Sequence, residues 1–113
     1  MNHYLISFPG EAMNLSEEEF VAAGLAAHAV VQEAKDAGVY VFGGGIAEDV
    51  PPVRVHDDGS VTDDTYPQTQ NLTGGFMVLK LSTRAEAIEW GRKTALACRC
   101  AQEVREFMYD PES

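Results

Sequence analysis

Two long segments with helical spacing, each flanked by short apolar runs, limit most strongly how this chain can fold. The first covers residues 15–38. Ser16 precedes an acidic first turn with Glu19 three positions later, which is typical of a capping box, and Gly38 is a C-terminal stop. Its apolar residues recur at helical spacing. The buried stripe is therefore expected to contain Phe20, Ala23, Ala27, Val31 and Ala34.

The second helix is expected over residues 83–98, with Ser82 or Thr83 as its N-cap. Its inner face is predicted to carry Ala85, Ile88, Trp90 and Gly91.

Short apolar runs around these helices predict the strands, which are His3–Phe8, Val39–Gly45, Gly74–Ser82 and a last strand within 101–109. A β-hairpin insertion is centred on Asp58–Gly59. The order is strand, helix, strand, hairpin, strand, helix, strand. It predicts a single α+β domain over residues 1–113, in which one antiparallel sheet carries both helices on one face. The uncovered, half-apolar face predicts a homodimer packed sheet to sheet.

The charge balance excludes several classes of partner. The chain has 8 basic and 18 acidic residues, with a formal net charge of -10, whereas nucleic acids and anionic membranes are bound through Lys and Arg. No apolar run approaches the roughly 20 residues that span a bilayer, and the first residues lack the features of a signal peptide. Cys98 and Cys100 are too close in sequence for a disulfide framework. A cytoplasmic location is expected.

The segment HDDGSVTDDTYPQTQNLTGGF, residues 56–76, concentrates four aspartates. Their spacing does not fit a calcium loop, and no metal is expected there. A hairpin with Asp58–Gly59 as a two-residue turn accounts for them better, since it makes Arg54 and Asp63 cross-strand neighbours and turns Asp64 to the other face. An Arg54–Asp63 pair is the simplest structural role for Asp63.

The same segment resembles the DGPF branch of the YCII-related family. Six residues match the signature without a gap, namely Thr62, Asp63, Thr69, Gly74, Gly75 and Phe76, and Tyr66 stands for a phenylalanine. Five others depart from it, namely Asp64, Thr65, Gln68, Gln70 and Asn71. The histidine-bearing helix, the glycine-rich strand end after it and the RAEAIEWGRK helix are similar to the family too.

This resemblance implies a ferredoxin-like fold of the dimeric α/β-barrel kind that dimerises through its sheet, and a cofactor-free protein. It also implies a cleft in which a helix histidine and an aspartate form an acid–base pair. His28 and Asp63 stand at those positions, and Asp49 is a rival partner for the histidine. The candidate ligand-binding residues are Tyr66, Thr69, Asp49 and Arg54.

His28 also attracts attention without the resemblance, because it lies at the edge of the predicted buried stripe. An imidazole can take or give a proton near neutral pH. A structural or surface histidine is the alternative. The FGGG run lacks the rest of a phosphate-binding loop, and the CRC motif lacks further ligands for zinc.

Two functions compete on these residues. The first is a cofactor-independent acid–base enzyme, of the isomerase or lyase type, that acts on a small organic molecule. The second is a non-catalytic module of the same fold that binds a small ligand or another protein. Loss of the signature's charged residues at Gln68, Gln70 and Asn71 favours the second.

Overall fold

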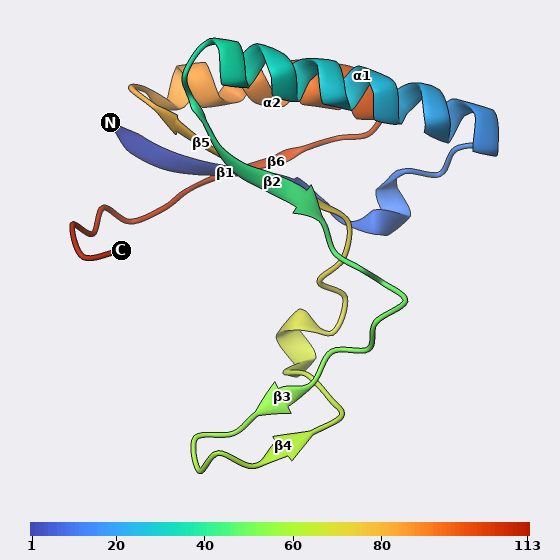
Figure 1. Cartoon of the computed structure of the whole chain (residues 1–113), viewed down its shortest axis with the longest axis vertical. Coiled ribbons are helices and arrows are strands. Elements are labelled where there is room, and N and C mark those ends of the chain that lie inside the picture. The colour runs from blue at the N-terminus through green and yellow to red at the C-terminus, as the bar shows by residue number, and fades with distance from the viewer.

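The computed structural model describes residues 1–113. It contains one four-stranded antiparallel sheet with two helices on one of its faces (Figure 1). The strands, in their order across the sheet, are β2 (Tyr40–Gly45), β5 (Gly75–Leu81), β1 (Asn2–Phe8) and β6 (Glu103–Glu106). The helices are α1 (Glu17–Asp36) and α2 (Arg84–Cys98). This is the ferredoxin-like α+β architecture that the sequence predicts, although β6 is shorter than expected.

The helix ends confirm the capping signals of the sequence. The Ser16 side chain accepts a hydrogen bond from the amide of Glu19, and the Glu19 carboxylate accepts one from the amide of Ser16, so that α1 begins with a complete capping box. Gly38 ends α1 in the left-handed region, with φ of 74°. At the start of α2, Thr83 rather than Ser82 is the N-cap.

The core lies between the sheet and the two helices. Its buried members are Tyr4, Ile6, Ala34, Met77, Leu79, Leu81 and Ala87. Small residues on the helices allow close packing on the sheet, and a Cβ atom on Gly91 would lie 3.0 Å from Cγ2 of Val104. Burial of these apolar side chains supplies most of the driving force for this layer.

Both predicted helix faces need correction. On α1, Ala23 and Ala34 are buried and Ala27 and Val31 are half-buried as predicted, but Phe20 is 56 % exposed at the first turn. On α2, the predicted residues Ala85 and Ile88 face outward. Gly91 is buried and Trp90 packs against the core, as predicted, and the other buried residues of the helix are Ala87, Thr94 and Cys98. The helix lies so close to the sheet that small residues, not Ile88, fit the contact.

Between β2 and β5 the chain leaves the body of the molecule as an arm, defined here as residues 47–72. The arm contains β3 (Arg54–Val55), β4 (Val61–Thr62) and the short 3-10 helix Pro67–Thr69. Figure 1 shows it on the side of the sheet that the helices do not cover.

The hairpin of the arm forms with a register different from the predicted one. Arg54 lies opposite Thr62, and Val55 lies opposite Val61, so the loop has three residues instead of two. Gly59 is its third residue and adopts φ of 86°, as in a turn that ends in the left-handed region. This one-residue slip brings Asp64, not Asp63, beside Arg54.

The other sheet face, here called the open face, is uncovered by any helix. The strand registers and the alternation of side chains place four apolar residues on it, Leu5, Phe42, Phe76 and Val78. Phe42 is 68 % exposed. Neither helix of the chain is long and apolar enough to cross a membrane.

Candidate functional site

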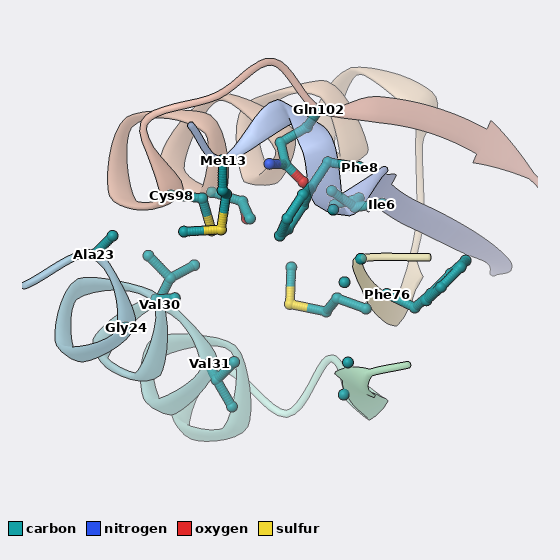
Figure 2. Close-up of a pocket in the computed structure, with 18 of the residues that line it drawn as sticks. Ile6, Phe8, Met13, Ala23, Gly24, Val30, Val31, Phe76, Cys98 and Gln102 are labelled. Carbon is teal, nitrogen blue, oxygen red and sulfur yellow. The ribbon is translucent and has the colours of Figure 1, made fainter. Parts of the chain in front are cut away.

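A cavity of about 450 Å³ opens between the sheet and the two helices, and it is called the cleft below. Its walls come from the end of β1, the start of β5, the end of β2, the inner side of α1 and the last turn of α2 (Figure 2). The volume falls within the range of about 300–1,000 Å³ that is typical of small-molecule sites.

Most of the cleft wall is apolar. Figure 2 shows side chains from both helices and from β1 converging on the same space. The apolar residues that they include are Ile6, Phe8, Met13, Phe20, Ala23, Val30 and Val31. Phe20, exposed at the protein surface, thus lies at the edge of this cavity. Such a wall would bind a ligand chiefly by removing its apolar surface from water.

Glycines shape the opposite wall. Gly44 and Gly45 end β2, and Gly74 and Gly75 begin β5. A Cβ atom at Gly75 would lie 2.7 Å from the ring of Phe8. The absence of side chains here lets the strand ends and the Phe8 ring approach one another, and it leaves the space beside them free for the cleft.

Four polar side chains interrupt the apolar wall, and each comes from a different part of the chain. His28 stands on α1, Thr94 on α2, Glu48 in the arm, and Gln102 just before β6. The Thr94 hydroxyl already donates to the carbonyl of Trp90 at 2.8 Å. Gln102 directs its amide toward the cleft in Figure 2.

His28 reaches the cleft because of its helical position. It follows Ala27 and precedes Val30 and Val31, which all line the same cavity. The residue is exposed to solvent and lines the cleft at its rim. The structure therefore agrees with the prediction that His28 lies at the edge of the buried face.

Glu48 is the only carboxylate on the cleft wall. An added Cβ atom on Gly10 would lie 2.8 Å from Oε1 of Glu48, so the carboxylate rests against the backbone at the end of β1. Neither Asp63 nor Asp49 lines the cleft. The acidic residue that shares the cavity with His28 is therefore Glu48, and neither of the two predicted aspartates does so.

Cys98 lines the cleft from the last turn of α2 and has no disulfide partner. Burial raises the pKa of its thiol, and the nearby Cys100 raises it further. A thiol with a raised pKa is mostly protonated near neutral pH and is a poor nucleophile. Cys98 therefore acts as a packing residue of the cleft wall.

The remaining candidates, Arg54, Asp63, Tyr66 and Thr69, belong to the arm and do not line the cleft. The guanidinium of Arg54 lies 2.7 Å from Asp64 and 5.4 Å from the centre of the Tyr66 ring. Its Nε atom is buried without a hydrogen-bond partner. Thr69 donates from its hydroxyl to the carbonyl of Tyr66 at 3.4 Å. These contacts order the arm.

A chain of polar contacts continues this order across the hairpin. Thr62 donates to Asp64 at 2.5 Å and lies 2.8 Å from Nε2 of His56. The Thr62 hydroxyl lowers the pKa of the Asp64 carboxyl most, and the charge of Arg54 lowers it further. Asp58 accepts bonds from the hydroxyl and the amide of Ser60, which lower its pKa. Asp58 and Asp64 therefore have structural roles in the hairpin, whereas the predicted ion pair of Asp63 with Arg54 is replaced by the Arg54–Asp64 pair.

Sequence reasoning missed Glu48, Gln102 and Met13 because each lies outside the helices, where periodicity gives no orientation. Cys98 had a usable signal, since it continues the spacing of Gly91 and Thr94 along α2. No group of three or more His, Cys, Asp or Glu side chains is arranged to hold a metal ion.

A comparison with known families identifies the family of the chain. The family described as the YCII-related domain matches residues 4–108, which include both helices, most of β1, the other three strands of the sheet, the arm and every polar residue of the cleft. No curated protein matches the chain.

Proposed function

The chain belongs to the YCII-related family, and on that basis we propose that it is a small acid–base enzyme that acts in the cleft. His28 moves a proton on a small organic molecule, in an isomerisation or an elimination. The observation that carries this proposal is a histidine at the wall of a mostly apolar cavity of ligand size. An imidazole there can reach a bound molecule and act as a proton donor or acceptor.

A second acid–base group is needed where a proton leaves one atom and another arrives elsewhere. Glu48 is our candidate, since it is the carboxylate that shares the cleft with His28. Asp63, the partner that the family resemblance implies, and its rival Asp49 are the other two candidates. Comparing Glu48→Gln, Asp63→Asn and Asp49→Asn separates the three, because only the true partner should lower turnover.

The charges of the cleft define the class of molecule. No lysine or arginine lines it, and Glu48 adds a negative charge to a chain that is already acidic. An organic anion would have no cation to pair with other than a protonated His28. We therefore propose a ligand with an apolar body and a neutral or cationic polar group that can bond to Gln102 or Glu48.

A thermal-shift screen tests the site. Wild type, His28→Ala and His3→Ala are compared against a set of small amines, alcohols, ketones and carboxylic acids that share the same hydrocarbon bodies. A ligand that binds the native state raises the melting temperature. His3 lies outside the cleft and is the matched control. The proposal requires a shift in wild type and in His3→Ala that is lost in His28→Ala.

The alternative function is a non-catalytic ligand-binding or regulatory module that uses the same cleft. It is favoured by the neutral residues Gln68, Gln70 and Asn71 where the signature has charged ones, because their loss removes acid–base groups. Turnover of a bound molecule with a pH profile that has a limb near the imidazole range, at about pH 6.5, indicates the enzyme. Saturable binding without turnover indicates the module.

We further assign the chain to the DGPF branch, on the signature residues from Thr62 to Phe76, and propose a cytoplasmic homodimer formed through the open face. The unpaired thiols suit a reducing compartment. The apolar residues of the open face support dimerisation, since exposed apolar patches of this kind usually mark an interface. In this proposal the protein partner of the chain is a second copy of itself.

A further inference from the structure

We propose that the arm, residues 47–72, packs against the open face of a second copy of this chain, so that each copy clasps the other. The inference rests on the homodimer proposed above and adds the element that holds it together. Three independent features of the chain support it, namely the missing core of the arm, the direction in which the arm projects, and the shape and charge of the open face.

The arm has no core of its own. None of its residues is buried, and its two strands have two residues each. Six large apolar residues of the arm are exposed, namely Val50, Val53, Val55, Val61, Tyr66 and Leu72. An isolated two-stranded hairpin is marginally stable at best in water. The apolar contacts that offset the entropy of ordering this segment must therefore come from another surface.

The polar contacts of the hairpin give it one defined shape but no contact with the body. Hydrogen bonds join Arg54 to Asp64, His56 to Thr62 and Asp58 to Ser60, all within residues 54–64. Buried apolar contacts would be needed to keep this shape. Val55 and Val61, which lie opposite each other, leave their side chains free for such contacts.

The direction of the arm suits a second copy. In Figure 1 it projects beyond the sheet on the side away from α1 and α2. The radius of gyration is 15.7 Å, whereas a compact chain of this length has about 13 Å. A body seated on the open face would lie beside the arm and fill the space that makes the single chain so extended.

The open face is hollowed at both ends. One hollow, of about 260 Å³, lies at the root of the arm and is lined by Leu5, Leu72 and Arg105 among others. The other, of about 420 Å³, lies at the C-terminal tail, residues 107–113, and is lined by Val78 and Phe107 among others. A two-fold axis between facing sheets can bring the arm of each copy to the tail end of its partner.

Charge favours the same arrangement. The arm carries six acidic residues, Glu48, Asp49, Asp57, Asp58, Asp63 and Asp64, against the single cation Arg54. On the open face, Lys80 has no acidic partner among the ion pairs of the chain, and it lines the hollow at the tail end. An acidic arm and an unpaired cation are complementary between two copies of one chain.

Sedimentation velocity over a range of concentrations tests the clasp. Wild type is compared with the arm variant Val55→Lys/Val61→Glu, which removes the apolar pair and keeps an attractive cross-strand pair in its place. Leu96→Asp is the matched control, because Leu96 is 77 % exposed on α2 and belongs to neither the arm nor the open face. Circular dichroism checks that all three proteins keep the fold.

We expect wild type and Leu96→Asp to sediment at twice the chain mass of 12.3 kDa. The arm variant should raise the dimer dissociation constant by about tenfold for each buried valine that it removes. An arm variant that dimerises as tightly as wild type overturns the clasp and leaves the sheet dimer standing. A monomeric wild type overturns both. Ligand binding in the cleft is measured separately by the thermal-shift screen, so the outcome of the dimer test does not decide whether the cleft binds a ligand.

Discussion

Replacing Gly74 with alanine should destabilise the protein much more than the same replacement at Gly38. Both glycines adopt the left-handed region, with φ of 87° and 74°. They differ in the space around them. A Cβ atom on Gly38 would meet nothing within 4 Å. A Cβ atom on Gly74 would overlap the carbonyl oxygen of Phe8 and lie 2.7 Å from the backbone nitrogen of Gly10.

The magnitude follows from these two contributions. The left-handed conformation costs an alanine about 1–2 kcal/mol at either position. At Gly74 the overlap adds a further cost of about 1–3 kcal/mol, because the obstructing atoms are backbone and cannot rotate away. The expected loss in the free energy of unfolding is therefore about 1–2 kcal/mol for Gly38→Ala and about 2–5 kcal/mol for Gly74→Ala.

Urea unfolding followed by the fluorescence of Trp90 measures this difference. Trp90 is the single tryptophan, and it packs against the core, so its emission reports on the folded body. The variants are compared at one protein concentration, since self-association would change apparent stability. Equal losses for the two variants would refute the close approach of β1 and β5 at Gly74. Because Gly74 lines the cleft, its variant should also weaken ligand binding.

Three further predictions concern single side chains. Thr62→Val should raise the lowered pKa of Asp64, since the Thr62 hydroxyl is its main cause, and an NMR titration of the carboxyl that shows no rise contradicts this. Because the pKa of Asp64 is lowered in the folded state, its carboxylate contributes its full stabilisation above the pKa of a free aspartate. This contribution is lost as the pH falls from there through the lowered pKa. Ser16→Ala should cost about 1 kcal/mol of unfolding free energy by removing the cap, and chemical denaturation checks it. Cys98 should react with iodoacetamide at pH 8 more slowly than a free cysteine, by mass spectrometry, because burial raises its pKa. An equal rate would contradict its burial.

The helix ends and the sheet topology could be predicted because local chemistry determines them. Ser16 and Glu19 need only each other to start α1, and Gly38 ends it through its own backbone freedom. The alternation of strand and helix patterns then leaves few ways to pair four strands. These features depend on residues that are close in sequence, so they can be predicted without knowledge of the tertiary structure.

The hairpin register and the inner face of α2 could not be predicted from local patterns. The same sequence is compatible with a two-residue turn and with a three-residue loop that ends at Gly59. The structure has the three-residue loop, and its register places Asp64 rather than Asp63 next to Arg54. On α2, Ile88 is the larger apolar residue, yet Ala87 faces the sheet because the helix packs closely there. Both outcomes depend on contacts with distant parts of the chain.

The candidate site was predictable in one residue only. His28 occupies a helix whose orientation the apolar spacing defines, so its position beside the cavity could be expected. Glu48 and Gln102 lie on connecting segments, and only the folded chain brings them to the same cavity. Asp63, the partner suggested by the family resemblance, lies in the arm.

Chemical-shift mapping of a bound ligand tests most directly the claim that the cleft is the functional site. A small molecule found in the thermal-shift screen is titrated into isotope-labelled protein, and the shifts of backbone and side-chain signals are followed to saturation. The expected result is that the largest changes fall on the His28 imidazole, the Gln102 amide and the amides of Gly44 and Gly45. Changes confined to Tyr66 and its neighbours in the arm would contradict the claim and move the ligand site there.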